Sequence, residues 1–254
     1  MPRQNKGTEN PMTTTPANIQ SKADSISVFF PCYNEQDNLR RLYESAAKVL
    51  QDMGVDYEII LVDDGSTDGT SQVTAALAAA DPRVKVVHHP KNLGYGAALQ
   101  SGFHTASKTL VFYTDGDGQY DPGELPRLLE RTGPATGLVN GYKLERQDPA
   151  HRIWIGSIYN FCARALFRIR IRDIDCDYRL IRRALLDEIR LTSTSGTICV
   201  ELVRKLELSG CEVLEVGVHH YPRRHGSSQF FRIQSLAVTL IQLVRLWVRL
   251  VILR

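Results

Sequence analysis

Short apolar runs alternate with longer amphipathic stretches from residue 25 onward. The apolar runs are too short for helices and rich in β-branched and aromatic residues, so they predict strands. These strands fall at 25–30, 57–62, 84–87, 110–114 and 138–140. Helices are expected between them. This alternation predicts an α/β fold with a mostly parallel, Rossmann-like sheet flanked by helices.

The second half of the chain continues with predicted helices at 153–167 and 197–209 and a strand at 211–218. Residues 230–254 are mostly apolar, but four polar side chains fall within a sector of roughly 80° on a helical wheel: Gln234, Gln242, Arg245 and Arg249. The longest uncharged part of this segment is too short to cross a bilayer. We expect an amphipathic C-terminal helix in the membrane interface, with its arginines reaching the headgroups. Packing on the domain or in a dimer is the alternative, which leaves oligomer formation open.

The polar N-terminal segment, residues 1–24, contains scarcely any large apolar side chain. We expect it to be a disordered tail. It has no apolar core segment, which argues against a secretory signal. The rest of the chain then divides into one domain at 25–229 and the C-terminal helix at 230–254.

Charge and cysteine content narrow the classes of protein. The formal net charge is +3 at pH 7, which is too mild to indicate a nucleic-acid partner. The five cysteines form no CxxC pair, which favours reduced thiols in the cytosol over a zinc site or a disulfide framework. His219, His220 and His225 have no recognised zinc-ligand spacing.

Polar clusters follow three of the predicted strands. Residues 33–35 follow the first strand, Asp63 and Asp64 follow the second, and residues 115–119 follow the fourth. Ligands of parallel α/β sheets bind beyond the carboxyl ends of the strands. We therefore expect the three clusters to meet at one edge of the sheet and to form the functional site.

The cluster Asp115-Gly116-Asp117-Gly118-Gln119 carries the clearest chemistry. If the extended geometry continues past the strand, Asp115, Asp117 and Gln119 point to one side. Two carboxylates on one side repel, which a hard cation such as Mg²⁺ or Mn²⁺ would relieve while keeping positions for substrate phosphates. Gly116 would let a ligand approach the backbone closely. A polar turn after a strand is the simpler alternative.

Two nucleotide-binding classes are excluded by detail. The segment after the first strand is Pro31-Cys32-Tyr33-Asn34-Glu35 and not a GxGxxG turn. The chain also contains no GxxxxGK[ST] phosphate-binding loop.

Four segments, in order, resemble the family-2 glycosyltransferases of the GT-A fold. They are FPCYNEQDNL, YEIILVDDGSTDGT, VVHHPKNLGYGAALQSGF and YTDGDGQYDPGEL. Within the family, the chain is most similar to the dolichyl-phosphate (polyprenyl-phosphate) mannosyl- and glucosyltransferases. The resemblance covers about residues 25–229.

The resemblance implies a binding site for a nucleotide sugar. The residues that would hold the donor are Pro31, Tyr33, Glu35, Asp63, Asp64, Asp115, Gly116, Asp117, Gln119 and Lys143. Within this set Asp115, Asp117 and Gln119 match the family's metal-binding triplet. Lys143 falls where the family usually has an arginine facing the donor diphosphate, and it keeps the charge without the bidentate fork. Core packing remains open for Tyr33, as does a capping or turn role for Asp63.

The acceptor side follows the family pattern less closely. Arg152, Arg179, Arg223 and Ser228 are the candidates to contact an acceptor phosphate. The family often has D-P-T-S-G-F-R where this chain has Asp173-Ile-Asp175-Cys-Asp177-Tyr-Arg179, so Asp175 and Asp177 depart from it. Arg223 and Ser228 match a loop that closes over the donor phosphates, although Gln229 replaces its usual lysine.

We therefore expect a metal-dependent inverting glycosyltransferase at the cytoplasmic face of a membrane, bound peripherally. It would move a hexose from GDP-mannose or UDP-glucose to a polyprenyl or dolichyl phosphate, with Asp117, Lys143 and Arg223 at the reacting centre. Transfer to a hydroxyl of a lipid-linked saccharide is an alternative, with Asp175 or Asp177 as base. A non-catalytic subunit that binds sugar nucleotides and recruits partners to the membrane is another.

Overall fold

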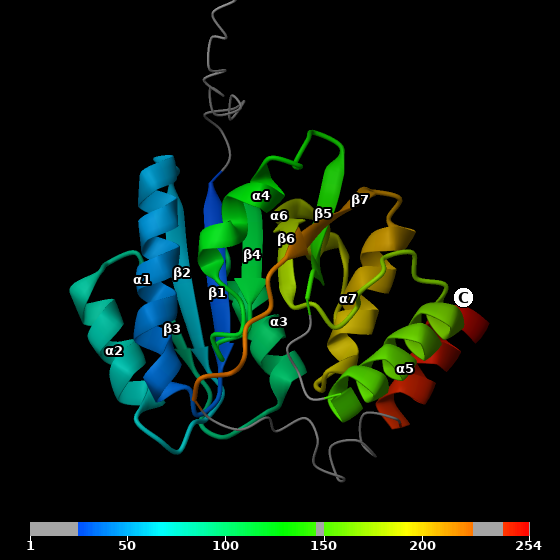
Figure 1. Ribbon diagram of the computed structural model, residues 1–254, viewed down its shortest axis with the longest axis horizontal. Coiled ribbons are helices and arrows are strands. Elements are labelled where there is room, and N and C mark those ends of the chain that lie inside the picture. Colours follow the sequence, from blue (N-terminus) through cyan, green and yellow to red (C-terminus); the bar gives the residue numbers. More distant parts are fainter. Residues whose placement is uncertain (1–24, 146–149, 226–240, 254) are drawn as a thin grey trace, which may run out of the picture.

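A seven-stranded sheet lies between two layers of helices in the computed structural model, which describes residues 25–145, 150–225 and 241–253 (Figure 1). The strands are β1 (Ile26–Cys32), β2 (Tyr57–Asp63), β3 (Val84–His88), β4 (Leu110–Thr114), β5 (Thr136–Lys143), β6 (Tyr178–Arg182) and β7 (Glu212–Val218). The helices are α1 (Gln36–Met53), α2 (Thr70–Ala80), α3 (Tyr95–Thr105), the 3-10 helix η1 (Pro122–Glu124), α4 (Leu125–Leu129), α5 (Ala150–Phe167), α6 (Arg183–Glu188) and α7 (Thr197–Leu208). A C-terminal helix begins its described part at residue 241 and ends in the π-helical turn η2 (Val248–Ile252).

The strand order is β3-β2-β1-β4-β6-β5-β7. β1 pairs in parallel with both β2 and β4, and β5 pairs in parallel with β7. β6 is antiparallel to its neighbours β4 and β5. The sheet is therefore mostly parallel, as the sequence predicted, with one reversed strand that the sequence did not predict.

Alternating side chains of β1 divide the core into two halves. Val28 and Phe30 pack with α1, α2 and α4 on one face of the sheet. Phe29 points to the other face, where α3, α5, α7 and the C-terminal helix cover the sheet. The Phe29 ring stacks on the Tyr113 ring, with centroids 5.2 Å apart. Phe103 meets the Phe29 ring edge-on, with centroids 5.1 Å apart. Both faces of the central strands are buried, which explains why their sequences are continuous apolar runs.

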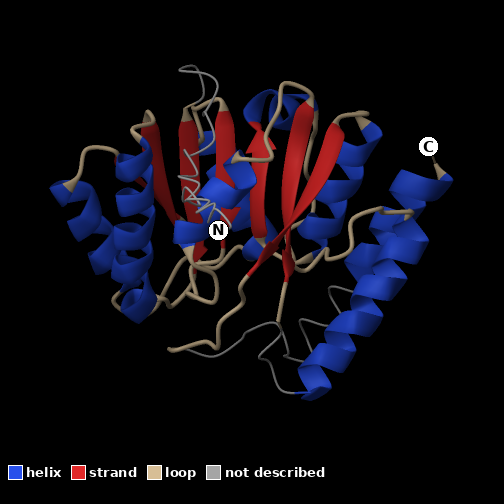
Figure 2. Ribbon diagram, turned by 45° about the horizontal axis from the view of Figure 1, so that its top comes forward, coloured by secondary structure: helices blue, strands red, loops and turns tan. Residues whose placement is uncertain are grey.

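α5 and the C-terminal helix lie side by side at one edge of the molecule (Figure 2). Leu243 and Leu246 of the C-terminal helix are buried in the core half that α5 and α7 share. Trp247 Nε1 donates a hydrogen bond to the carbonyl oxygen of Leu166 at 3.0 Å. The C-terminal helix thus packs on the domain, which was the alternative to a purely membrane-bound helix. Within the described residues, no helix is both long and apolar enough to cross a membrane.

Most predicted elements match observed ones within a few residues, but two were missed. β6 and α6 follow each other without a break and were not predicted. Asp121 is the N-cap of η1, because its side chain accepts a hydrogen bond from the Gly123 amide. The predicted disordered tail at 1–24 lies outside the described residues.

Candidate active site

The three polar clusters meet at one edge of the sheet, at the carboxyl ends of β1, β2 and β4. Cys32 at the end of β1 is paired with Asp63 at the end of β2. The amide of Gly116, just after β4, donates to the carbonyl oxygen of Pro31 at 3.2 Å. The predicted convergence of these strand ends is therefore observed, and it places Asp115 and Asp117 next to the start of α1.

Arg223 closes this site from a segment that follows β7. Its Nη2 atom lies 3.0 Å from Glu35 Oε1 and 2.9 Å from Asp117 Oδ2. Its Nε atom is buried and has no hydrogen-bond partner among the described residues. A buried, unpartnered guanidinium N–H beside two carboxylates is a donor suited to an anionic oxygen such as that of a phosphate.

Glu35 is held in place at the start of α1. Its Oε2 accepts a hydrogen bond from Asn38 Nδ2 at 2.7 Å, and its side chain is 9% exposed. Burial raises the pKa of Glu35 to about 7, against the opposing effects of Arg223 and Asn38. The carboxylate therefore depends on Arg223 for its charge, which couples these two residues.

Asp115 is a buried acid with two other carboxylates nearby. Burial, and then the neighbouring carboxylates of Asp177 and Asp117, raise the pKa of Asp115 well above its usual range. Tyr95 partly offsets this, because its hydroxyl donates to Asp115 Oδ1 at 2.7 Å. Carboxylates gathered in this way lack enough positive charge around them, which a bound cation would supply.

The residues present fit a hard divalent cation. Asp115 and Asp117 offer carboxylate oxygens, which Mg²⁺ and Mn²⁺ prefer. No group of three or more His, Cys, Asp or Glu side chains within the described parts of the chain could hold a metal by itself. A cation here would therefore take two protein carboxylates and complete its shell with other oxygens, as Mg²⁺ commonly does with substrate phosphates.

Gln119 connects the Asp115–Asp117 segment to the segment that carries Arg223. Its Nε2 atom donates to the carbonyl oxygen of Tyr221 at 3.1 Å, and its own carbonyl oxygen accepts from the Tyr221 amide at 2.8 Å. These two hydrogen bonds hold residues 219–223 beside Asp117. Sequence analysis grouped Gln119 with the metal ligands, and the structure adds this second contact.

Asp63 is held by several contacts within the protein. Its side chain is fully buried, and its oxygens accept hydrogen bonds from Ser66, Ser71 and His88. Burial opposes these hydrogen bonds, but together they lower the pKa of Asp63. Asp63 therefore organises the loop before α2, which agrees with the capping or turn alternative. Its contact with a nucleoside remains a prediction.

Asp64 is also engaged by the protein. It accepts from His89 Nδ1 at 2.6 Å and from the amides of Leu93 and Gly94 at 2.9 and 3.0 Å. These contacts fix the loop that starts α3. Pro31 is buried at the end of β1, while Tyr33 is half-buried, so the Tyr33 ring keeps a surface for a flat ligand.

Gly116 is required for packing more than for ligand access. A Cβ atom at this position would lie 2.7 Å from the carbonyl oxygen of Pro31 and 3.0 Å from Cys32 Sγ. The absence of a side chain lets the ends of β1 and β4 come together. The approach of a ligand to the backbone at Gly116 remains a prediction.

Lys143 does not point to the carboxylate cluster. Its Nζ atom donates to the carbonyl oxygen of Asp175 at 2.8 Å and lies 3.9 Å from Asp173 Oδ2. The side chain is 6% exposed. Lys143 thus stabilises the 173–175 segment. Its contact with a donor diphosphate remains a prediction.

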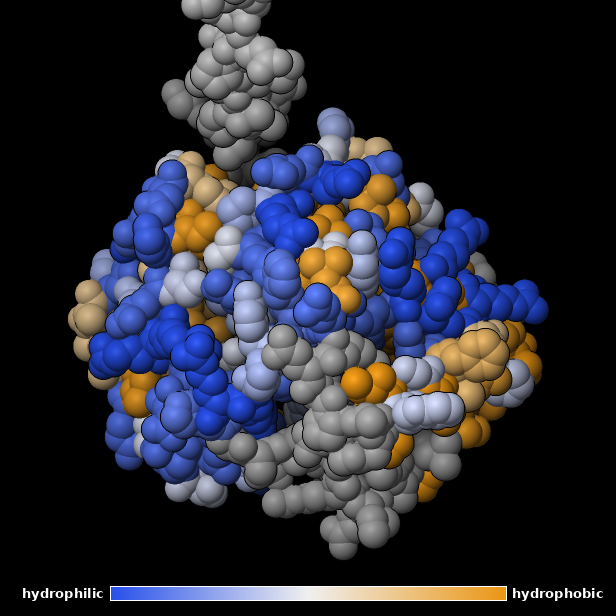
Figure 3. All heavy atoms as spheres, viewed as in Figure 1, coloured by the Kyte–Doolittle hydropathy of each residue, from blue (hydrophilic) through white to orange (hydrophobic). Residues whose placement is uncertain are grey.

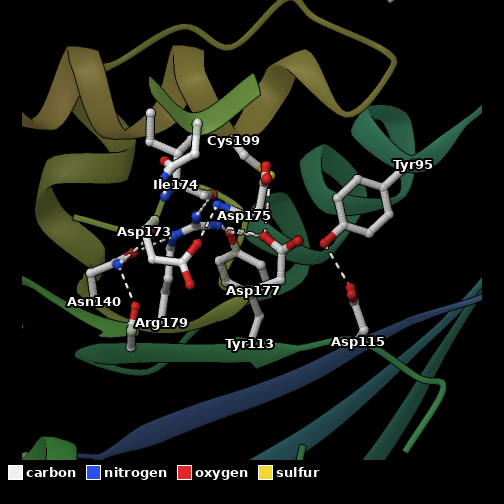
Figure 4. A network of polar contacts seen from close by, with 12 residues as sticks. Tyr95, Tyr113, Asp115, Asn140, Asp173, Ile174, Asp175, Asp177, Arg179 and Cys199 are labelled. Carbon is white, nitrogen blue, oxygen red and sulfur yellow. Dashed lines mark hydrogen bonds and ion pairs between the residues drawn. The ribbon is translucent and has the colours of Figure 1, made fainter. Parts of the chain in front are cut away.

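Arg179 is likewise engaged by the protein (Figure 4). The residue is fully buried on β6, and its Nε donates to Asn140 Oδ1 at 2.7 Å. Its other nitrogens donate to Tyr113, to Asp177 at 2.6 Å and to the carbonyl oxygen of Ile174. The guanidinium therefore shapes the 174–177 segment from inside and has no exposed face for an acceptor phosphate.

Asp177 is a site residue whose position the sequence did not reveal. Its Oδ1 atom accepts from Arg179, from Cys199 Sγ at 3.1 Å and from the Tyr113 hydroxyl at 3.4 Å. Figure 4 shows its carboxylate on the side of the network that faces Tyr95 and Asp115. The departure from the family pattern at this position was the available signal, and the structure places the Asp177 carboxylate near Asp115.

Two further candidates lie outside what the structure describes. Ser228 belongs to residues 226–240, and the side chain of Arg152, in the first turn of α5, is likewise outside the described part. Their predicted contacts with an acceptor phosphate remain predictions.

This site and fold define a class of protein that comparison with known families confirms. The family model described as "Glycosyl transferase family 2" matches residues 27–190, so the chain belongs to glycosyl transferase family 2. Among characterised relatives, the undecaprenyl-phosphate 4-deoxy-4-formamido-L-arabinose transferase of Pseudomonas fluorescens (strain SBW25) is 32% identical over 206 residues. The same-named protein of Pseudomonas aeruginosa (strain LESB58) is 32% identical over 208 residues. The matches cover 81% and 82% of this chain and 60% of each relative.

Solved structures confirm the GT-A fold. Glucosyl-3-phosphoglycerate synthase from Mycobacterium tuberculosis, in complex with Mn²⁺, UDP and glucosyl-3-phosphoglycerate, superposes with a TM-score of 0.69. The match covers 95% of this chain and 86% of the synthase at 20% sequence identity. A complex of the same synthase with Mg²⁺ and UDP gives a TM-score of 0.67, at 20% identity over 89% of this chain and 79% of the other.

Proposed function

We propose that this chain transfers a sugar from a nucleotide sugar to a polyprenyl phosphate, with inversion at the anomeric carbon. The observation that carries the proposal is the contact of Arg223 with Glu35 and Asp117. It places a guanidinium with an unpartnered N–H over the carboxylate pair that suits a divalent cation. Such an arrangement of positive charge matches a departing diphosphate.

The donor would lie along the carboxyl ends of β1, β2 and β4. Tyr33, which is half-buried beside the buried Pro31, offers an aromatic surface to the base. Glu35 offers an acceptor for ribose or base N–H and O–H groups once Arg223 turns to the diphosphate. Asp64 supports the donor site indirectly, through the loop before α3.

Asp115 and Asp117, with Gln119 beside them, would hold Mg²⁺ or Mn²⁺. The bound cation would neutralise negative charge that develops on the diphosphate. The M. tuberculosis synthase has been crystallised with Mn²⁺ and with Mg²⁺, so the fold can accommodate either ion. The comparison supports the fold and not the individual metal ligands of this chain.

In the reaction, an ionised oxygen of the acceptor phosphate forms a bond to the anomeric carbon. The bond from that carbon to the donor diphosphate breaks, and its electron pair leaves with the nucleoside diphosphate. The attacking oxygen is already deprotonated near neutral pH, so no strong general base is needed. Arg223 stabilises the charge on the leaving group from the position that the structure gives it.

The acceptor assignment draws on the relatives, which are named for undecaprenyl phosphate. Of the four acceptor-phosphate candidates, Arg179 is engaged inside the protein and Arg223 contacts Glu35 and Asp117, which leaves Arg152 and Ser228 for the acceptor. The C-terminal helix would hold the enzyme peripherally at the cytoplasmic face of the membrane, where lipid acceptor and soluble donor meet.

The sugar and the nucleotide follow from the resemblance in part. The family likeness favours a hexose from GDP-mannose or UDP-glucose, whereas the relatives are named for a formamido-arabinose. Both possibilities require a nucleotide-linked sugar as donor. The assay below, run with one donor at a time, separates a hexose from a formamido-arabinose.

Transfer to a hydroxyl is a second candidate, and Asp177 is the observation that favours it. Its carboxylate faces Asp115 and Tyr95, so it lies where a base for a hydroxyl acceptor would be needed.

In the test, purified full-length chain is given Mn²⁺ and one donor at a time, with either undecaprenyl phosphate or an undecaprenyl-linked sugar in detergent micelles. Mass spectrometry of the lipid product should show one added sugar on the polyprenyl phosphate. Product with the lipid-linked sugar alone would support the hydroxyl alternative, and product with neither acceptor for any donor would contradict both.

A further inference from the structure

The outward face of α5 is apolar although no part of the described protein covers it. Five of its large side chains are strongly exposed: Trp154 (72%), Phe161 (71%), Ile158 (57%), Ile155 (48%) and Leu166 (45%). Trp154, Ile158 and Phe161 are spaced four and three residues apart, so they form one stripe along the helix. The opposite side of α5 buries Ala163 and Phe167 in the core. An α-helix that is apolar on both sides at the surface of a domain indicates a second apolar environment.

The C-terminal helix extends this face. Ile241, Val244, Val248 and Ile252 are 37–56% exposed and recur at intervals of three and four residues. Trp247 joins this helix to α5 through its hydrogen bond to Leu166. Figure 3 shows apolar side chains gathered along the edge of the molecule that these two helices form. We call this surface, made of the exposed side chains of α5 and residues 241–253, the apolar edge.

Positive charge borders the apolar edge. Arg245 and Arg249 are one helical turn apart on the C-terminal helix, both exposed, and they line a polar pocket with Thr192, Ser193 and Thr194. Arg249 donates to the Thr192 hydroxyl at 2.6 Å. At the end of α5, Arg168 and Arg170 are also exposed. Apolar side chains flanked by arginines match the acyl and headgroup layers of an anionic bilayer.

The inward side of α5 contacts the acceptor side of the site. Asn160 Nδ2 donates to the carbonyl oxygen of Arg172 at 2.6 Å, and Asn160 Oδ1 accepts from the Ile174 amide at 3.1 Å. Tyr159 lies close enough to Asp175, Cys199 and Asp177 that these groups, after burial, raise its pKa. The helix that carries Trp154 and Phe161 outward therefore also positions residues 172–177, which adjoin Asp115.

From these observations we propose that α5 and the C-terminal helix together form one membrane-docking surface for anionic phospholipid, with Trp154 and Phe161 inserted at the acyl–headgroup boundary. The inference rests on the proposed function for its purpose, because a lipid acceptor would then arrive beside residues 172–177. It makes α5 the main anchor, where the sequence had indicated the C-terminal helix. Binding of α5 to the bilayer needs no donor, metal or acceptor.

Vesicle binding tests the proposal without any glycosyl transfer. Full-length chain is sedimented with vesicles of phosphatidylcholine alone or with phosphatidylglycerol added. The wild type should bind the anionic vesicles, and Trp154→Gln/Phe161→Gln should bind them at least about tenfold more weakly. Val86→Gln is the matched control, because Val86 is 37% exposed on β3 and away from the apolar edge, and it should bind as the wild type does. Arg245→Gln/Arg249→Gln should reduce the advantage of anionic over neutral vesicles.

A spectroscopic measurement tests the docking surface independently, in case the double variant binds weakly because it is misfolded. In Trp247→Phe the remaining tryptophan is Trp154, and its emission should shift to shorter wavelength and become shielded from iodide when anionic vesicles are added. Unchanged emission with bound vesicles would overturn the role of α5. A concentration-dependent dimer in solution that disappears in Trp154→Gln/Phe161→Gln would also overturn it, and would assign the apolar edge to a second copy of the chain. Loss of glycosyl transfer with vesicle binding intact would count against the proposed function and not against the docking surface.

Discussion

The guanidinium of Arg223 lies 2.9 Å from the Asp117 carboxylate, across 106 residues of sequence. The same nitrogen reaches Glu35 at 3.0 Å, so one cation holds two acids from different strand ends. The segment after β7 is thereby fastened over the site by charge. The residues that would receive a diphosphate and a metal are also the residues that keep this segment closed.

Replacing Arg223 should separate the roles of charge and geometry. Arg223→Gln removes the cation over the proposed leaving group, and we expect kcat to fall roughly 10²-fold or more. Arg223→Lys keeps the charge but loses the planar fork, so it should recover part of the rate. Arg40→Gln on the exposed side of α1 is the control and should leave turnover unchanged. Steady-state kinetics with the donor found above provides the measurement, and wild-type kcat in Arg223→Gln would contradict the proposed role.

Asp115→Asn should lower activity and raise stability. The carboxylate of Asp115 is buried near Asp177 and Asp117, so neutralising it removes repulsion in the metal-free protein. We expect the Tm without metal to rise by about 2–4 °C and metal-dependent turnover to fall roughly 10²–10³-fold. Thermal unfolding in EDTA and again with Mn²⁺ provides the comparison. Asp52→Asn, at an exposed position on α1, should change neither quantity. If Mn²⁺ stabilised Asp115→Asn as strongly as the wild type, Asp115 would not be a metal ligand.

Arg179→Met should destabilise the fold and not specifically weaken acceptor binding. The substitution leaves Asn140, Tyr113 and Asp177 without the donor that they share, at a cost of about 3–5 kcal/mol. Urea unfolding at neutral pH measures this change, with the exposed Arg183→Met as control. A variant with wild-type stability and a raised KM for the acceptor would restore the original acceptor-phosphate assignment.

The pH dependence of stability should report Glu35. Burial raises the pKa of Glu35 in the folded protein to about 7, from 4.5 for a freely exposed glutamate. Between these values the folded state binds more protons than the unfolded state, so this group makes stability fall as pH rises from about 4.5 to about 7. Above pH 7 its contribution is constant. The difference in unfolding free energy between wild type and Glu35→Gln, measured in EDTA from pH 5 to 8, should follow this slope, while Glu44→Gln should not alter the wild-type profile. A difference that is flat across this range would contradict the raised pKa.

The donor side of the site could be predicted because each part is local. Apolar runs mark β1, β2 and β4, and the acids that follow them must share an edge once the strands are parallel. The contact of Arg223 with Glu35 joins residues 188 positions apart, and no local pattern specifies it. β6 was missed because its sequence, YRLIR, contains two arginines and does not read as an apolar run. Its antiparallel direction is not encoded in the periodicity of the sequence. The sequence likewise named Arg179 as an acceptor-phosphate candidate, since only the fold shows that Asn140 and Asp177 surround it.

The reversed direction of β6 has a consequence for how the chain can be altered. β5 ends and β6 begins at the same edge of the sheet, and Asn140 is paired with Arg179 across the two strands. Residues 144–177, which include α5, therefore leave the sheet and return to it at neighbouring points. We expect that this segment can be exchanged for the corresponding segment of another family member, because the exchange leaves the paths of β1, β2 and β4 unchanged. We call residues 144–177 the cassette. A chimera that takes this cassette from another family member should adopt that member's lipid preference while keeping its own sugar nucleotide.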